Sequence, residues 1–164
     1  MFLYIVRHGI AIDRADPHSP PEPERPLTPK GIEKTRAAML GLRELGIKPD
    51  AMFTSPYLRA AQTAEIACEA FGFPREKVRQ AVSLKPGSNP GDFVKELASV
   101  RAKEVMCFGH APHVDHLIAF LAGARAAFTE LKKAGVACFQ IEAAHAGKSR
   151  LQWILPPKVL RSLS

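Results

Sequence analysis

The sequence lacks several features that define whole classes of protein. No apolar run approaches the ~20 residues that a membrane-spanning helix needs, so we expect no helical membrane protein. The chain opens on an apolar, strand-like segment without a basic leader or cleavage site, which predicts that there is no signal peptide. Its only cysteines, Cys68, Cys107 and Cys138, lie in apolar segments without paired spacing. This pattern favours buried thiols over disulfides and predicts a cytoplasmic protein.

The sequence also lacks a stripe of basic residues interleaved with aromatic ones. The formal net charge is +7, but the 23 Lys and Arg residues are scattered, with at most two adjacent, at Lys132-Lys133. Aromatic residues make up only 7% of the chain. Nucleic-acid binding is therefore not expected, and the positive charge is better explained by electrostatic steering of an anionic, phosphorylated partner.

What the sequence does contain indicates one α/β domain over residues 1–164. At 46% hydrophobic residues, the chain has enough apolar surface for a sizeable core. Apolar strand-like runs alternate with helical patterns and end in a β-pair, joined by a turn over 143–149; the runs are Phe2–Arg7, Ala51–Thr54, Glu104–Phe108, Val136–Ile141 and Arg150–Leu155. This order predicts a three-layer α/β/α sandwich with a mostly parallel mixed sheet.

Four helices are expected between these strands. Thr28-Pro29, Ser55-Pro56 and Asn89-Pro90 each place a capping side chain before a proline, which is typical of a helix start, and a fourth helix is expected to open within 109–112. The segment Ile10–Leu27 is predicted to be irregular, because six of the 14 prolines fall within 17–29. A loop of this length in a compact domain is usually functional, so we expect it to cover a site.

Cationic side chains follow three of the predicted strands. Arg7 and His8 end the first strand, Arg59 follows the second, and His110 follows the third. Ligands bind at the carboxyl ends of the strands in open α/β sheets. Two arginines and two histidines that converge at one point require an anion, and the natural one is a phosphoryl group.

Each of these residues also has a structural explanation. A lone histidine at a strand end is usually a hydrogen-bonding group, but Gly9 can bring a carbonyl against one nitrogen of His8 and leave the other free as a nucleophile. Arg59, one turn inside a helix capped by Ser55, can hold an anion at the helix N-terminus. His110 lies at the start of the fourth expected helix, where the helix N-terminus is expected to lower its pKa and where it can donate a hydrogen bond to a phosphoryl oxygen.

A zinc site is the alternative explanation for His110, His113 and His116, which are spaced three apart. That spacing drifts around a helix, and no cysteine pair or carboxylate set completes a metal site. We therefore predict no metal and no cofactor. His113 and His116 are expected on a helix face, with His113 a candidate for the pocket rim, and His18 and His145 in loops.

Four segments together resemble the histidine phosphatase superfamily, whose fold is called phosphoglycerate-mutase-like. They are Arg7-His8-Gly9, Arg25-Pro26-Leu27-Thr28 with Gly31, Ser55-Pro56-Tyr57-Leu58-Arg59-Ala60-Ala61-Gln62-Thr63, and Gly109-His110-Ala111-Pro112. The short chain and the Gly-His-x-Pro form resemble the SixA-type phosphohistidine phosphatase branch in particular.

The resemblance implies a role for each matching residue. His8 would be the nucleophile that becomes phosphorylated, and Arg7, Arg59 and His110 would complete the phosphate pocket. Arg25 would support the site from the loop, and Ser55 would contact the phosphate. No metal is implied, because cationic groups stabilise the phosphoryl charge. The pocket would hold a free phosphate or sulfate ion as well.

The sequence departs from larger members of that superfamily at one point. They carry a glutamate as general acid in a Leu-x-Glu-like segment, whereas the comparable stretch here, Leu84-Lys85-Pro86-Gly87, has no acid. An alkoxide leaving group needs a proton from such an acid, but an imidazole, with a pKa of ~6.5, departs without it. Four loop carboxylates are possible substitutes, and the sequence does not choose among them: Asp13, Asp16, Glu22 and Glu24.

These observations predict a metal-independent phosphatase that removes phosphate from histidine on a protein, for example on a phosphotransfer domain, through a phosphorylated His8. One alternative is a small-molecule phosphomonoesterase of the same fold that uses a loop carboxylate. The other is a non-catalytic module that binds phosphorylated partners through the same pocket.

Overall fold

The protein is built around one mixed sheet of six strands. The computed structural model describes residues 1–142 and 148–164. The strands are β1 (Phe2–Arg7), β2 (Ala51–Thr54), β3 (Arg79–Gln80), β4 (Glu104–Gly109), β5 (Val136–Ile141) and β6 (Ser149–Leu155). Their order is β3-β2-β4-β1-β5-β6; the first four are mutually parallel, whereas β5 and β6 run antiparallel to their neighbours. The predicted mostly parallel mixed sheet is confirmed.

The central strands are buried on both faces. Alternate side chains of a strand point to opposite sides of the sheet. Leu3 and Ile5 of β1 therefore join one hydrophobic core, while Tyr4 and Val6 join the other. This explains why β1 is a continuous apolar run rather than an alternating one, as expected for a parallel sheet covered by helices.

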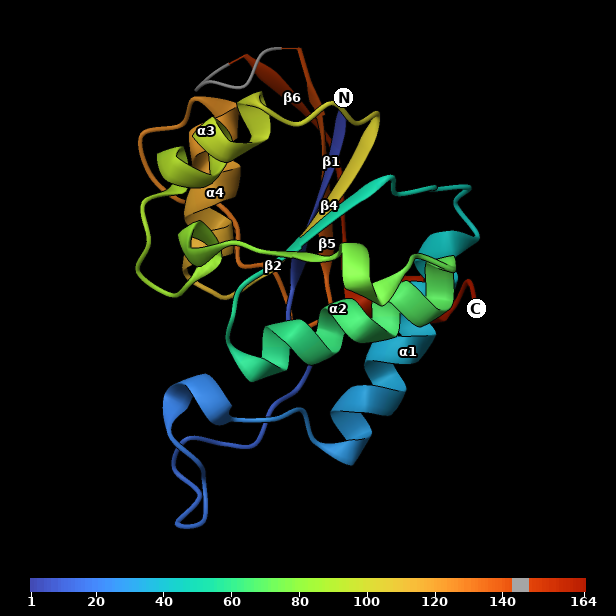
Figure 1. Ribbon diagram of the computed structural model, residues 1–164, viewed down its shortest axis with the longest axis vertical. Helices are drawn as coiled ribbons and strands as arrows, with labels where there is room; N and C mark the ends of the chain where they lie inside the picture. The colour runs from blue at the N-terminus through green and yellow to red at the C-terminus, as the bar shows by residue number, and fades with distance from the viewer. Residues whose placement is uncertain (143–147) are drawn as a thin grey trace.

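Helices cover both faces and complete the three layers (Figure 1). They are α1 (Pro29–Arg43), α2 (Leu58–Phe71), α3 (Pro90–Ala98), α4 (His113–Ala122) and α5 (Pro157–Arg161), with short 3-10 turns η1 (Glu22–Glu24), η2 (Arg75–Lys77) and η3 (Val82–Leu84). Residues of α1, α2 and α5 pack in one core, and residues of α3 and α4 pack in the other. The predicted α/β/α sandwich is confirmed.

Three of the predicted helix starts are confirmed and one is wrong. Thr28 caps α1 by accepting from the Gly31 N–H, and Asn89 caps α3 by accepting from the Gly91 N–H. The cap of α4 is Pro112, within the predicted 109–112. Ser55, however, is not the cap of α2, which begins at Leu58, because a short non-helical segment first places Ser55 beside His110.

Outside the site, the described residues agree with most of the sequence expectations. All three cysteines are free and buried. β5 and β6 pair as predicted, although most of the turn expected between them, 143–147, lies outside the described residues, and so does His145. Helix α5 and the short strand β3 were not predicted. In the part of the chain that the structure describes, no helix is both long enough and apolar enough to span a bilayer.

Candidate active site

The predicted convergence of site residues occurs where β1 and β4 end side by side. Arg7 is in register with Gly109, and the His8 N–H donates to the Gly109 carbonyl at 3.0 Å. The next residue of each strand is therefore a histidine at the same edge, and the His8 and His110 rings lie 5.0 Å apart between centroids. This edge lies at the lower end of the sheet in Figure 1.

His8 is held with one ring nitrogen engaged by the backbone. Its Nδ1 lies 2.7 Å from the Gly9 carbonyl, so Nδ1 carries the ring proton and Nε2 keeps its lone pair. The predicted bond is confirmed. Gly9 is needed for a second reason that was not predicted, because a Cβ there would collide with the Thr35 hydroxyl.

Arg59 approaches the free nitrogen of His8. It is the second residue of α2 and only 3% exposed, and its Nε–H donates to His8 Nε2 at 3.2 Å. Its Nη1 and Nη2 donate to the carbonyl and the carboxylate of Glu22, at 2.7 and 3.1 Å. The Tyr57 ring lies 5.3 Å from the guanidinium carbon. Arg59 therefore links the candidate nucleophile to the proline-rich loop.

Ser55 contacts His110. Its Oγ lies 2.8 Å from His110 Nε2 and also accepts the Tyr57 N–H at 3.3 Å. The Ser55 hydroxyl hydrogen is thus free to donate to Nε2, an arrangement in which the His110 proton resides on Nδ1. That Nδ1 is buried and has no partner among the described residues. In this arrangement Nδ1–H is an unpaired hydrogen-bond donor, and a phosphoryl oxygen could accept from it.

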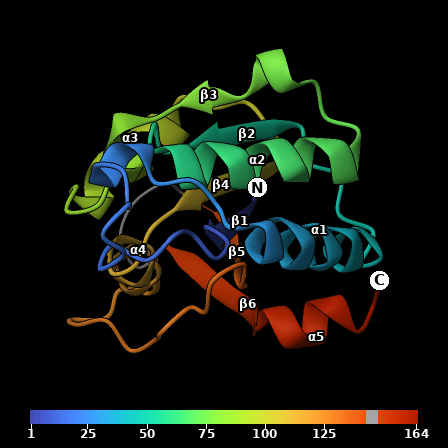
Figure 2. The ribbon, with the colours of Figure 1, turned by 90° about the horizontal axis from the view of Figure 1, so that it is seen from below.

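A cavity of about 480 Å³ opens beside His8 and Arg59, whereas Ser55 and His110 are not among its lining residues. Arg7, His8, Arg25 and Arg59 line it together with loop residues. Arg7 donates through Nη1 to the Leu131 carbonyl at 2.7 Å, which fixes its guanidinium at the wall. The loop over 10–27 covers the cavity as predicted, and Figure 2 shows its turn η1 beside the amino end of α2.

The site concentrates positive charge away from water. Burial, the largest cause, lowers the pKa of His8 to about 3 despite the opposing bond from Gly9, and Arg59 and Arg7 lower it further. Burial likewise lowers the pKa of His110 to about 2, with added repulsion from His8 and Arg59. Burial and the charge of Arg25 lower the pKa of Arg59. All three shifts disfavour positive charge, and a bound anion would reverse them.

Comparison with known proteins identifies the family. The sequence model described as "Histidine phosphatase superfamily (branch 1)" matches residues 3–132. The chain belongs to this superfamily. It is 40% identical over 141 residues to an uncharacterized protein of Picosynechococcus sp., covering 83% of this chain and 82% of that one. It is 28% identical over 125 residues to the phosphohistidine phosphatase SixA of Escherichia coli, covering 74% of each chain.

Several solved structures share the fold. The protein histidine phosphatase SixA complexed with tungstate superposes with a TM-score of 0.86 at 24% identity, covering 98% of this chain and 99% of that one. A phosphoserine phosphatase mutant from Entamoeba histolytica, in complex with phosphoserine, gives a TM-score of 0.72 at 14% identity, covering 97% and 98%. One architecture therefore accommodates proteins with different named substrates.

Three residues of this superfamily member hold the site through contacts that the sequence analysis did not predict, although it named Glu22 as a candidate acid. Glu22 bonds Arg59, while Gln62 accepts the Leu27 N–H at 2.7 Å and Thr63 accepts the Gly9 N–H at 3.0 Å. Gln62 and Thr63 lie in the quoted segment that starts at Ser55, one turn after Arg59. Their spacing on the helix face that carries Arg59 was the available signal.

The structure distinguishes the four loop carboxylates by where each one lies. Among the described residues that line the catalytic cavity, Asp13 is the only carboxylate. Burial would raise the pKa of Glu22, but its bond with Arg25 and the charges of Arg25, Arg59 and Arg14 outweigh this and lower it, so Glu22 stays ionised. Asp16 and Glu24 are exposed in the loop.

The other described histidines, His18, His113 and His116, differ in their exposure to solvent. His113 is buried at the first position of α4, whereas His116 is exposed one turn later, and His18 is exposed in the loop. Across residues 1–142 and 148–164, no group of three His, Cys, Asp or Glu side chains gathers closely enough to hold an ion.

Proposed function

We propose that the protein is a phosphohistidine phosphatase that acts on a histidine-phosphorylated protein through a phosphorylated His8. The observation that carries this proposal is the orientation of His8, whose Nδ1 is bound by the Gly9 carbonyl and whose Nε2 faces Arg59. This leaves one nitrogen with a lone pair, beside the Arg59 guanidinium in the cavity. A base with a pKa of about 3 stays unprotonated at neutral pH and is available to attack.

The chemistry proceeds in two steps. His8 Nε2 attacks the phosphorus, the P–N bond to the substrate imidazole breaks, and the imidazole leaves with a proton from water. Water then attacks phospho-His8, inorganic phosphate departs, and Nε2 regains its lone pair. The Nε–H of Arg59 exchanges its hydrogen bond to His8 for one to a phosphoryl oxygen. Arg7 and the His110 Nδ1–H donate to the other phosphoryl oxygens.

The carboxylates of the cavity favour this substrate. The Leu84-Lys85-Pro86-Gly87 segment supplies no acid, and Glu22 is ionised and engaged with arginines. A phosphomonoester needs an acid of the enzyme to protonate its leaving oxygen, whereas an imidazole can take its proton from water. General-acid assistance is worth ~10²–10⁴ in rate, so the lack of a dedicated acid penalises esters strongly.

The decisive experiment measures phosphate release, in the presence of a chelator, from a histidine-phosphorylated protein and from an alkyl phosphomonoester, phosphoserine, whose leaving oxygen needs a proton. We expect fast release from the first substrate and little from the second. Comparable or faster hydrolysis of the ester would overturn the assignment, and no turnover of either substrate would identify a phosphate-binding module instead.

His8→Ala tests the covalent step. We expect turnover to be lost while the circular dichroism spectrum and melting temperature stay close to those of the wild type. Wild-type protein quenched in alkali should carry an alkali-stable, acid-labile phosphoryl group on His8, detectable by mass spectrometry without acidification, that the variant lacks. A folded His8→Ala protein that still turns over would exclude the covalent route.

A second candidate function, hydrolysis of a small phosphomonoester, is supported by Asp13, which lines the cavity with His8. Asp13→Asn keeps the size of the side chain and removes its acid. If Asp13 protonates an ester leaving group, this variant should lose ~10²-fold or more of the ester activity and little of the phosphohistidine activity. For the phosphohistidine phosphatase proposed above, the two activities should change by less than threefold. Asp16→Asn in the same loop is the matched control.

A further inference from the structure

A second cavity adjoins the catalytic one and has no role in the mechanism above. It encloses about 520 Å³ between α1, α5 and the segment 130–134 that leads into β5. Figure 2 shows α1 and α5 side by side. Arg7, Ile10 and Lys133 line both cavities, so the two share a wall. We call this second space the basic cavity.

The basic cavity carries a large excess of positive charge. Five cations line it, against one carboxylate: Arg7, Lys34, Lys132, Lys133 and Arg161 against Glu130. Glu130 is already paired with Lys132 at 2.8 Å. Within residues 1–142 and 148–164, the other four cations make no ion pair. Like charges held around one cavity repel one another, and an anion between them would relieve the repulsion.

Two buried polar atoms of the lining also lack partners. Thr35 is fully buried, and its Oγ1 has no hydrogen-bond partner in the described part of the chain. The same holds for Nε of Arg7, whose Nη1 already serves the Leu131 carbonyl. Both atoms are buried beneath the cavity surface, so an anion in the cavity would meet the cations that line it rather than these two atoms.

The shared wall determines which ligand this is. An anion in the basic cavity would lie one arginine side chain away from the phosphoryl group at His8, which is close enough for both groups to belong to one substrate. Lys132 and Lys133 are exposed, which lets the positive surface continue outward from the cavity. Lysines are flexible point charges that can pair with anions in varied positions. A protein surface rich in carboxylate side chains presents its anions in this way.

We propose that the basic cavity docks carboxylate side chains that flank the phosphohistidine of the protein substrate. This inference rests on the proposed function, because it assumes that the phosphoryl group arrives on a polypeptide. Aspartate and glutamate side chains near the phosphohistidine would pair with Lys34 and Arg161. The net charge of +7 would speed the encounter with such an acidic surface.

The test compares two synthetic phosphohistidine peptides that differ only in their flanking residues, four glutamates in one and four glutamines in the other. For the wild type we expect kcat/KM to be ~10-fold higher on the glutamate peptide at low ionic strength, and the preference to shrink in 0.5 M salt. Lys34→Glu and Arg161→Glu should each bring the ratio of the two values close to one.

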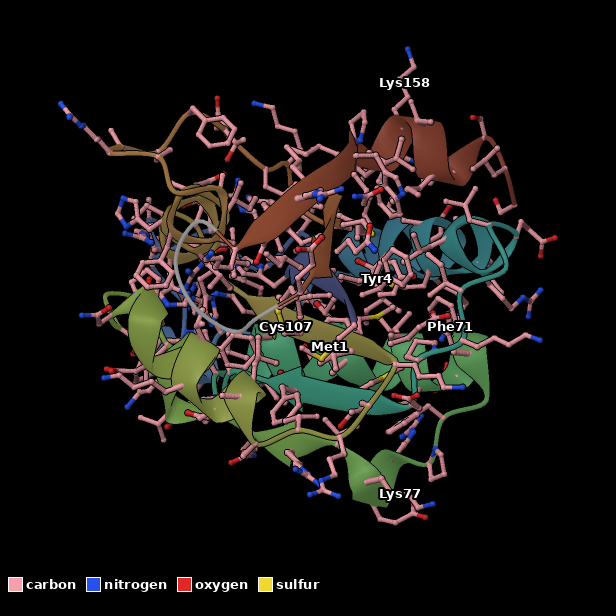
Figure 3. The ribbon with its side chains drawn as sticks, turned by 90° about the horizontal axis from the view of Figure 1, so that it is seen from above. Met1, Tyr4, Phe71, Lys77, Cys107 and Lys158 are labelled. Atoms are coloured by element: carbon pink, nitrogen blue, oxygen red, sulfur yellow. The ribbon has the colours of Figure 1, made fainter. Side chains whose placement is uncertain are left out.

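Lys158→Glu is the matched control. Lys158 lies on α5 like Arg161, but it is exposed, does not line the basic cavity, and points away from the molecule in Figure 3. Lys158→Glu makes the same change in net charge as the other two variants. It should keep the preference for the glutamate peptide within twofold of the wild-type value. An equal loss of preference in this variant would mean that only overall charge matters, and would overturn the docking site.

A binding measurement separates the failure of this inference from the failure of the proposed function. The dissociation constant of the unphosphorylated glutamate peptide, labelled with a fluorophore, is measured by anisotropy for the same variants. If no phosphate is released from either peptide, the proposed function fails. Docking is still supported in that case if the unphosphorylated glutamate peptide binds Lys34→Glu more weakly than it binds the wild type and Lys158→Glu. If both peptides are hydrolysed with unchanged preference in Lys34→Glu and Arg161→Glu, docking is excluded. If both variants lose activity equally on the two peptides, the cavity serves the catalytic pocket or a small anion, which also overturns the inference.

Discussion

At the scale of single residues, the site depends on how Arg59 distributes its hydrogen bonds. The guanidinium is planar, and its three nitrogens point in fixed directions. Nε–H is directed at His8, and Nη1 and Nη2 are directed at Glu22, so one side chain joins the candidate nucleophile to the loop. A flexible ammonium group cannot serve both partners. The position therefore demands arginine for its shape as well as its charge.

Arg59→Lys should accordingly behave almost like Arg59→Ala. We expect both variants to lose ~10²–10³-fold in kcat/KM on a phosphohistidine substrate, with effects on both kcat and KM, because the lost donors act on the developing phosphoryl charge. Arg36→Lys is the control, since Arg36 is an exposed arginine that pairs with Glu69 on the surface. If steady-state kinetics gave Arg59→Lys a wild-type kcat/KM, charge alone would suffice and the geometric argument would be wrong.

The residue scale also shows what the sequence can reveal about a site. His8 with its Gly9 carbonyl was predictable, because the bond joins adjacent residues in the chain. The contact between His110 and Ser55 spans 55 positions and depends on β2 and β4 lying together. Glu22 was one of four equivalent loop carboxylates until the fold placed it over Arg59. Hydrogen bonds between adjacent residues can be predicted from the sequence, whereas the contacts of Ser55 and Glu22 depend on how the loop and the sheet pack.

At the scale of elements, the amino end of α1 holds the loop in place. Gly31 lies in the first turn of α1, directly against the backbone of Ile10, where a Cβ would collide with the Ile10 carbonyl. The Thr28 N–H donates to that same carbonyl at 2.9 Å. Because Ile10 lines both cavities, the start of this helix positions a wall of the site.

Gly31→Ala sets two effects against each other. Alanine is a better helix former than glycine by about 1 kcal/mol, but the collision with Ile10 forces backbone movement that costs about 1–3 kcal/mol. We expect the collision to win, so that the free energy of unfolding falls and kcat/KM falls with it. Urea denaturation and steady-state kinetics measure the two effects, with Lys30→Ala in the same turn as the control. A variant more stable than the wild type would show that helix propensity dominates.

Helix boundaries could be predicted only where the cap is local. Thr28 and Asn89 bond an N–H two or three residues ahead, and both starts were correct. Ser55-Pro56 has the same pattern, but Ser55 is drawn to His110, so the helix starts later, at Leu58. The short helix α5 begins after Pro156 and buries Leu160 against α1, a contact that its few residues do not announce in the sequence.

At the scale of the whole molecule, the cation-rich site makes stability depend on pH. Burial is the main cause that lowers the pKa values of His8, His110 and His113, from 6.5 to about 3, 2 and 4. The unfolded chain therefore binds more protons than the folded one below pH 6.5. Stability is then complete above pH 6.5 and falls as the pH falls toward the folded pKa values, by up to about 1.4 kcal/mol per pH unit for each histidine.

His113→Leu separates this effect from the active site. His113 is 1% exposed, and neither ring nitrogen has a partner in the described residues, so an apolar replacement removes an unsatisfied group as well as a proton acceptor. We expect the variant to be at least as stable as the wild type at pH 7, and to lose less of its free energy of unfolding between pH 6.5 and pH 5. Urea denaturation at half-unit pH intervals measures both slopes. His116→Leu, an exposed position on the same helix, should retain the wild-type slope. If His113→Leu also retained it, protonation of this buried ring would not contribute to acid unfolding, and the pH dependence would have to arise elsewhere in the molecule.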